Sequence, residues 1–253
     1  MSELLAFEWR RAKSIRTTWI TSIFTILGVG FFAFIATVAV SAETGDPLDL
    51  PLSNTLETAV INNPIVLVLL SSLAAMAFGH EYRYGTIRLT LTAFPRRAGV
   101  FFVKLCVTLL LVFLVTALGA GLAYAIMAGS GKTSPGDLAW SSLAWHLVVF
   151  ATTFAVLAFS FTVIARSHPL GIVGPLLLFM LELILLPLIA SRYEWVPKLF
   201  PITAMTNWFS AGSDALLGAG VWAAWMVGLL LLSFVLLMRR DAFEAINGYD
   251  ETL

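Results

Sequence analysis

Charged residues are scarce in this chain, and their scarcity excludes a water-soluble fold. Asp, Glu, Lys and Arg together make up 12% of the 253 residues, whereas hydrophobic residues make up 59%. Soluble globular domains carry about 25% charged residues, so a water-soluble protein of this composition could not cover its apolar side chains. A lipid bilayer accepts them, at about 20 apolar residues for each spanning helix. The composition therefore indicates an integral membrane protein.

Cysteine is nearly absent and histidine is rare. Cys106 is the single cysteine, which excludes an internal disulfide and a cysteine-rich metal site. The histidines, His80, His146 and His168, are never three or four residues apart, so no helix carries the paired ligands of a metal or haem site. We therefore predict no catalytic residue, metal ligand or cofactor-binding residue in this chain, which disfavours an enzyme or a redox subunit.

Six long apolar runs organise the sequence. They lie at residues 19–40, 64–80, 99–127, 141–165, 169–190 and 216–238. Backbone groups in hydrocarbon must pair within the protein, and no alternation of period two indicates a barrel, so these runs are predicted to be helices. The second run is short, and Pro64 suits its first helical turn. We predict an all-α membrane protein with six transmembrane helices in one domain, residues 1–253.

The distribution of lysine and arginine predicts the orientation. If the N-terminus is inside, twelve of the fifteen cations fall in cytoplasmic segments, and the outer segments hold Lys132, Arg192 and Lys198. Cytoplasmic loops are enriched in these residues, so both termini are predicted to be cytoplasmic. The first apolar run has about 22 residues, longer than the 7–15 of a signal peptide, so we expect an uncleaved helix.

Three segments lie outside the regular spans of the predicted bundle, residues 19–240. Residues 1–18 are basic with interleaved apolar side chains, as expected of a short helix at the inner membrane interface. Residues 191–218 precede the last span and are apolar but broken by prolines. Such a segment is expected to be partly re-entrant and buried against protein. Residues 241–253 are predicted to form a cytosolic tail.

Residues 129–133 read GSGKT, which resembles the end of a nucleotide-binding P-loop. That motif has a glycine five positions before its second glycine, and Ile126 stands there in this chain. The predicted topology also places Lys132 on the outer face, away from ATP. We therefore predict that this chain does not bind nucleotide.

Glu182 is the one ionisable residue deep within a predicted span. Such acids are costly in a bilayer and are functional candidates by default. Helical spacing places Glu182 on the face of Gly171, Gly174, Pro175 and Leu178, a small-residue face able to approach another helix. Glu182 is expected either to contact a substrate or proton, or to be a packed interhelical acid. With Leu178 and Asn62 it forms our candidate substrate path.

The segment 78–104 is the longest polar, cation-bearing interruption between two apolar runs. Gly85 permits a turn after the second span, and residues 86–94 are predicted to form a short amphipathic helix. The Phe94–Pro95 pair disfavours helix at Phe94, and Pro95 suits the start of the third span. Such a helix could pass the movement of a partner protein to the two spans that it connects. The alternative is a basic loop that only fixes the orientation of these spans in the membrane.

The residues Glu81, Gly85-Thr86, Pro95, Arg97 and Lys104 resemble the corresponding segment of ABC-2-type transporter permeases. The resemblance extends to the layout of an N-terminal helix, six spans and a long outer segment before the last. In that family this segment is the coupling helix that docks on a separate ATPase subunit. The coupling residues that the resemblance implies are Glu81, Tyr84, Gly85, Thr86, Ile87, Arg88, Leu91, Phe94, Pro95 and Arg97.

The resemblance also implies partners. The complex would contain two ATPase subunits, which bind ATP and Mg²⁺, and a second permease protomer, identical or not, in a bacterial inner membrane. The first, second and fifth spans would line a path for an outward-moving amphipathic or hydrophobic substrate such as a drug, peptide antibiotic or lipid. No nucleic-acid partner is implied. The alternative hypotheses are an ATP-independent, proton-coupled transporter that uses Glu182 and a structural or assembly factor.

Overall fold

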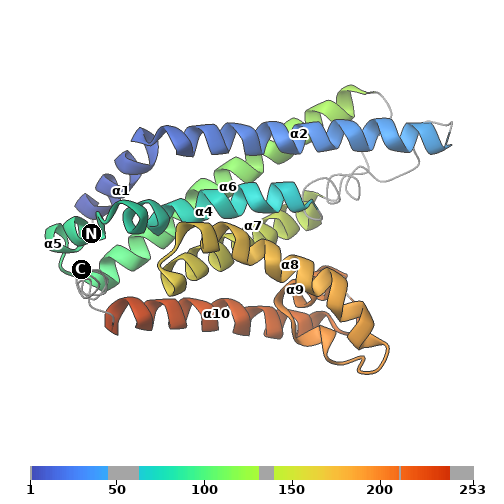
Figure 1. The fold of residues 1–253 in the computed structure, drawn as a ribbon. Coiled ribbons are helices and arrows are strands. Elements are labelled where there is room, and N and C mark those ends of the chain that lie inside the picture. The colour runs from blue at the N-terminus through green and yellow to red at the C-terminus, as the bar shows by residue number, and fades with distance from the viewer. Residues whose placement is uncertain (1, 45–62, 131–139, 211, 240–253) are drawn as a thin grey trace, which may run out of the picture.

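The fold is a bundle of long helices, seen in a computed structural model that describes residues 2–44, 63–130, 140–210 and 212–239 (Figure 1). Within these residues every regular element is helical, and six helices are long and apolar enough to cross a membrane. The six are α2 (Arg16–Thr44), α4 (Pro64–Tyr84), α6 (Arg97–Gly129), α7 (Trp140–Ala165), α8 (His168–Ala190) and α10 (Ala215–Arg239). The prediction of an all-α membrane protein with six spans is confirmed.

Shorter helices mark the two ends of the bundle. Helices α1 (Ser2–Ser14) and α5 (Ile87–Ala93) lie at one end, which we call the α5 end (Figure 1). The 3₁₀ helix η2 (Pro197–Leu199) and helix α9 (Pro201–Phe209) lie at the opposite end, the α9 end. The chain thus places the polar segment between the second and third spans, and the segment before the last span, at opposite ends.

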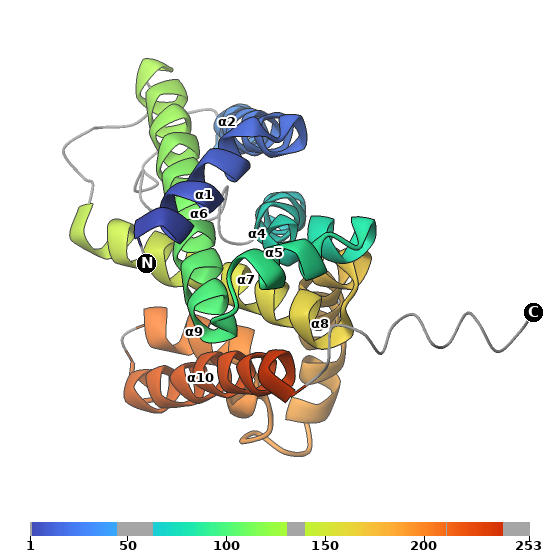
Figure 2. The same cartoon turned by 90° about the vertical axis from the view of Figure 1, so that its left-hand side faces the viewer.

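Helix α7 lies at the centre of the packing. It contacts α4, α6, α8 and α10, while α2 packs on α6 and α4 (Figure 2). Phe150, Phe154 and Leu157 of α7 are fully buried in the main core. Helices α8 and α10 instead expose many leucine side chains, as expected for helices whose outward faces meet lipid.

Local sequence signals explain both ends of α4. The side chain of Asn63 caps its start, since Oδ1 accepts hydrogen bonds from the backbone N–H groups of Ile65 and Val66 at 3.0 and 3.4 Å. Pro64 occupies the first turn, as predicted. At the other end Gly85 adopts a left-handed conformation with φ of 66°, which a glycine accepts without steric cost. The predicted turn at Gly85 is confirmed.

The second span is longer than the sequence indicated. We predicted a short run, 64–80, but α4 has 21 residues and continues to Tyr84. The reason is Glu81, a charged residue that looks like the start of a loop yet is buried within the last turn of the helix. Its charge is matched by cations from other helices, as described below, so the helix does not need to end there.

The junction between α5 and α6 also differs slightly from the prediction. Helix α5 is one residue shorter at each end than the predicted 86–94. Helix α6 begins at Arg97 and not at Pro95. Pro95 lies in a short non-helical link, where the backbone N–H of Arg97 donates to the Pro95 carbonyl at 3.0 Å. This link allows the chain to change direction between the two helices.

Close packing of α8 follows from its small residues, as predicted. A Cβ atom on Gly171 would lie 1.8 Å from Oγ1 of Thr162 on α7 and 2.9 Å from Cβ of Ala75 on α4. One on Gly174 would lie 2.6 Å from the ring of Phe161. These glycines let α8 approach two neighbours at once.

The segment before the last span packs against protein. Ile202, Ala204 and Met205 of α9 are buried, and α9 contacts α10, α7 and α8. Trp208 packs on the main core. The expected burial against protein holds for α9, whereas Tyr193, Trp195 and Leu216 elsewhere in the segment are exposed. A re-entrant position in the bilayer remains a prediction.

Candidate functional site

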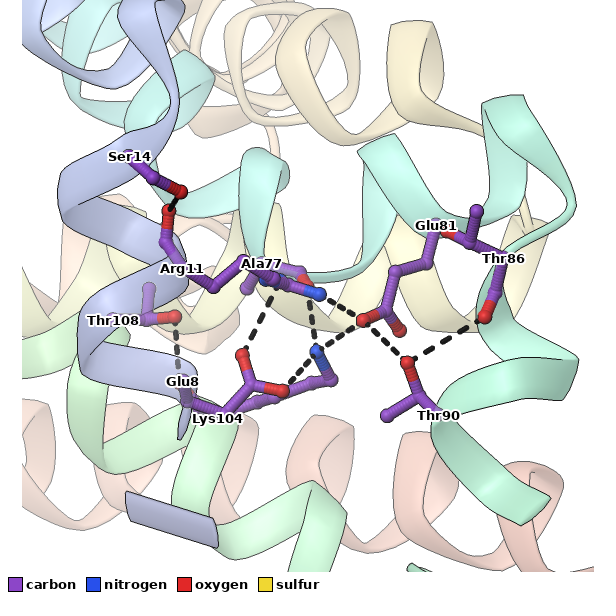
Figure 3. A network of polar contacts seen from close by, with 9 residues as sticks. All are labelled: Glu8, Arg11, Ser14, Ala77, Glu81, Thr86, Thr90, Lys104 and Thr108. Atoms are coloured by element: carbon purple, nitrogen blue, oxygen red, sulfur yellow. Dashed lines mark hydrogen bonds and ion pairs between the residues drawn. The ribbon is translucent and has the colours of Figure 1, made fainter. Parts of the chain in front are cut away.

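Glu81 is the centre of a buried polar network at the α5 end (Figure 3). It lies in the last turn of α4 and is 2% exposed. An unpaired buried carboxylate would cost several kcal/mol, but Oε1 of Glu81 has partners from three other helices. It lies 2.8 Å from Nζ of Lys104 on α6, is paired with the guanidinium of Arg11 on α1, and accepts a hydrogen bond from Oγ1 of Thr90 on α5 at 3.0 Å.

Glu8 on α1 completes the network. Its Oε1 lies 2.7 Å from Nζ of Lys104, whose side chain is fully buried, and its Oε2 lies 3.3 Å from Arg11. The two cations also donate to the carbonyl of Ala77 on α4, Arg11 at 2.7 Å and Lys104 at 3.3 Å. Two carboxylates and two cations give no net charge, which is the condition under which buried ions persist. We call Glu8, Arg11, Glu81 and Lys104 the buried quartet.

The buried quartet joins α1, α4 and α6 into one unit, and Thr90 attaches α5 to it (Figure 3). Burial lowers the pKa of Arg11, while the carboxylate of Glu8 raises it. Arginine is effectively always protonated in proteins, so Arg11 keeps its positive charge within the quartet. Loss of one member would leave a buried charge without its partner, which costs about 3–5 kcal/mol.

Helix α5 has one packed side and one exposed side. Ile87 packs against the aromatic cluster around Phe78, and Leu91 and Phe94 pack against the cluster that includes Leu4. This agrees with the predicted apolar side of the helix. On the other side Leu89 is 71% exposed.

The coupling residues inferred from the family resemblance fall into three groups. Glu81 is buried; Ile87, Arg88, Leu91, Phe94 and Arg97 are half-buried; and Tyr84, Gly85, Thr86 and Pro95 are exposed. Tyr84 is 66% exposed, on the same stretch as Leu89. Arg97 instead donates hydrogen bonds to the carbonyls of Leu237 and Met238 at the end of α10. It therefore connects the start of α6 with the last span.

Sequence reasoning missed Glu8, Arg11, Thr90 and Leu89. Glu8 and Arg11 lie in the basic N-terminal segment, 1–18, for which the sequence indicates only a helix at the membrane interface. Their spacing of three residues was the available signal, because such a pair shares one helix face. Lys104, a cation beyond the first turn of an apolar span, was a second signal that a buried carboxylate lies nearby.

Glu182 lies at the other end of the bundle and holds the start of α9. Its Oε1 accepts from the backbone N–H of Ile202 at 3.2 Å, and its Oε2 accepts from the backbone N–H and the hydroxyl of Thr203 at 2.7 and 2.9 Å. The carboxylate, 5% exposed, therefore caps the N-terminus of α9, where a negative charge is stabilised. Gly171 and Pro175, predicted to share its face, are also buried.

The other candidates for the substrate path are placed differently. Leu178 is half-buried and packs against the main core. Asn62 lies outside the described residues. The structure therefore does not bring Leu178 into the group that contacts α9. The segment 129–133 lies only partly within the described residues, with Gly129 at the end of α6.

Comparison with known proteins identifies the family. A sequence model described as ABC-2 family transporter protein matches residues 4–191, which is more than half of the chain. The match includes the buried quartet, α5 and Glu182. No match was found among curated proteins. Members of this family are transmembrane permease subunits and not enzymes, and the family implies association with an ABC ATPase subunit. The chain belongs to the ABC-2 family of transporter proteins.

Proposed function

We propose that this chain is the permease subunit of an ABC exporter and that α5 is its docking helix for the ATPase. One observation carries the proposal: α5 exposes Leu89 on one side while Thr90, the next residue, bonds to buried Glu81. Contiguous exposed apolar patches mark interaction sites, and Leu89 shares its exposed stretch with Tyr84. A partner that binds Leu89 would therefore hold a helix that is attached directly to two spans.

The buried quartet offers a route for the movement. When the partner binds ATP and shifts α5, Thr90 passes the shift to Glu81 on α4, and Lys104 passes it to α6. Arg11 and Glu8 carry it to α1. Glu81 thus acts from within the protein, through α5, while Tyr84 and the turn at Gly85 and Thr86 extend the docking surface around Leu89.

The proposed assembly has two permease protomers and two ATPase subunits, which hold the ATP and Mg²⁺. The excess of lysine and arginine at the α5 end supports a cytoplasmic position for this end, and for both termini, in a bacterial inner membrane. The path between protomers would be lined by α2, α4 and α8. Their exposed side chains are mainly leucine, isoleucine, valine and phenylalanine, which favours an amphipathic or hydrophobic substrate moving outward.

The alternative, a proton-coupled transporter that uses Glu182, draws less support. Both carboxylate oxygens of Glu182 already accept hydrogen bonds from α9. These bonds attach Glu182 to the start of α9, which gives the carboxyl group a structural role there. The contacts of Glu182 are therefore explained by its capping of α9, without a role in proton transfer.

The test is co-purification of the permease with a co-expressed candidate ATPase, comparing wild type with Leu89→Glu. We expect the wild type to retain the ATPase and the variant to lose it by roughly tenfold or more, because a charge at the centre of an apolar contact removes a main source of binding energy. Leu89 is exposed, so the substitution leaves the fold intact.

Leu199→Glu is the matched control. Leu199 is also an exposed leucine, at 45%, but lies in η2 at the α9 end. The Leu199→Glu variant should retain the ATPase at the wild-type level. Equal retention by Leu89→Glu and Leu199→Glu would refute α5 as the docking surface, and a wild type that purifies without any ATPase would refute the exporter assignment.

A further inference from the structure

A cavity of about 570 Å³ lies beside Glu182 at the α9 end. Its walls come from α8, η2, the start of α9 and Pro64 at the start of α4. Phe179, Met180, Leu183 and Leu186 of α8 form the apolar wall, and Glu182 with Thr203 and Thr206 forms the polar part. Sites for small molecules have this composition, mostly apolar with a few fixed polar groups.

Among the described residues that line the cavity, Glu182 is the one ionisable side chain. Glu182 receives three hydrogen bonds, two on Oε2 and one on Oε1, and these bonds fix the position of the carboxyl group at the cavity wall. Among the described residues, no ion pair involves Glu182. Lys198 on η2 is close in sequence to the cavity wall but pairs with Asp214 at 2.6 Å. Within the described residues, the polar contacts of the carboxyl group thus come from the start of α9.

We propose that this cavity binds an amphipathic cation, with its positive group beside Glu182 and its apolar part against α8. The inference rests on the proposed permease function and specifies the charge of the substrate. Attraction between opposite charges is strong where water is largely excluded. An anion is disfavoured for two reasons: the carboxylate repels it, and the start of α9, the usual anion site on a helix, is already occupied by Glu182.

The position of the cavity fits a transport site. It lies where the start of α4 meets α8, two of the three spans that line the proposed path. Pro64 and Leu183 reach it from these two helices, and Leu183 is 59% exposed. A ligand could therefore enter from the outward face of α8 without disturbing the core.

Two probes of the same shape and opposite charge test the proposal. Tetraphenylphosphonium and tetraphenylborate are each titrated, by equilibrium dialysis, onto the full chain in lipid nanodiscs, and binding to empty nanodiscs is subtracted. We expect the wild type to bind the cation roughly tenfold or more tightly than the anion. Glu182→Gln should reduce this ratio to near one. A wild type without preference, or a Glu182→Gln variant that keeps it, would overturn the proposal.

A second variant protects the test against loss of folding, since Glu182→Gln also weakens the cap of α9. Thr206 is exposed and lines the cavity, and its hydroxyl donates to the carbonyl of Thr203 at 2.9 Å, whereas the bonds to Glu182 come from Ile202 and Thr203. Thr206→Lys should therefore leave the cap intact, weaken cation binding and strengthen anion binding. Thr92→Lys is the matched control, an exposed threonine on α5 at the other end of the bundle, and should bind both probes as wild type does. Unchanged binding by Thr206→Lys would contradict the proposed site.

The binding test is independent of the ATPase. It uses the permease without nucleotide, so it can fail while Leu89→Glu still abolishes co-purification, and that result would leave the exporter assignment standing with a different substrate charge. Conversely, a cation preference that depends on Glu182 would support the site even if α5 proved not to bind an ATPase.

Discussion

Nζ of Lys104 lies 2.8 Å from Oε1 of Glu81, and both residues are almost completely buried. The pair joins the first part of α6 to the last turn of α4, next to the turn that leads into α5. Because the carboxylate also accepts the hydroxyl of Thr90, any displacement of α5 acts directly on this ion pair. In the proposed mechanism, stability and coupling to the ATPase depend on the same few atoms, and the two can be separated by choosing which contact to remove.

Removal of Lys104 should destabilise the protein strongly, because it leaves the buried quartet with an excess negative charge. Lys104→Met is expected to cost about 3–5 kcal/mol in the free energy of unfolding, measured as a lower thermal unfolding temperature in detergent. Glu8→Gln added to Lys104→Met removes the excess charge and keeps the Arg11–Glu81 pair. The double variant should thus be more stable than Lys104→Met alone.

Arg96→Met serves as the control for the loss of a cation at the same end, since Arg96 is exposed. It should unfold within about 0.5 kcal/mol of wild type. If the double variant were no more stable than the single one, the charge balance of the quartet would not be the source of its stability.

Loss of the Thr90 hydroxyl should uncouple the permease without unfolding it. Thr90→Val removes the bond from α5 to Glu81, at a cost of about 1–3 kcal/mol, while Leu89 stays exposed for docking. We expect the ATPase to co-purify normally, and transport by reconstituted complexes to fall by several-fold at unchanged ATPase binding.

Thr92→Val is the matched control for this measurement. Thr92 is exposed on the same helix, and its hydroxyl bonds to the carbonyl of Arg88 within α5, at 2.6 Å. Loss of this hydroxyl in Thr92→Val should leave transport unchanged. Equal effects of the two valine substitutions would show that the bond to Glu81 carries no movement.

Features that depend on neighbouring residues in the sequence, such as helical spans and helix ends, could be predicted. Helical spans follow from apolar length, the start of α4 from Pro64, and the turn after it from Gly85. The apolar side of α5 followed from the spacing of Ile87 and Leu91. Each of these signals lies within a few residues of the feature that it predicts.

Contacts between distant residues could not be predicted in this way. Glu81 looked like a loop residue because the cations that neutralise it, Arg11 and Lys104, lie on other helices. Their pairing kept α4 helical beyond the predicted end. For the same reason the sequence could not decide whether Glu182 contacts a substrate or proton or is a packed interhelical acid. Its partners are backbone groups of α9, and no pattern of side chains predicts such partners.

The close approach of α8 to α7 and α4 should be sensitive to a single methyl group. Gly171→Ala would place Cβ against Thr162 and Ala75, and overpacking of this kind costs about 1–3 kcal/mol. Gly220→Ala on α10 is the control, because a Cβ there meets nothing within 4 Å. It should be neutral or slightly stabilising. Thermal unfolding that is equal for both variants would contradict the close packing of α8.

The turn at Gly85 offers the most local prediction. A Cβ at this position meets nothing within 4 Å, so any effect of Gly85→Ala comes from the backbone, whose φ of 66° costs a non-glycine residue about 1–2 kcal/mol. Gly85→Asn should cost less, because asparagine tolerates this conformation. The unfolding temperature is expected to be highest for the wild type, lower for Gly85→Asn and lowest for Gly85→Ala. Alanine equal to glycine would mean that the turn relaxes, and then the start of α5 would not be fixed by it.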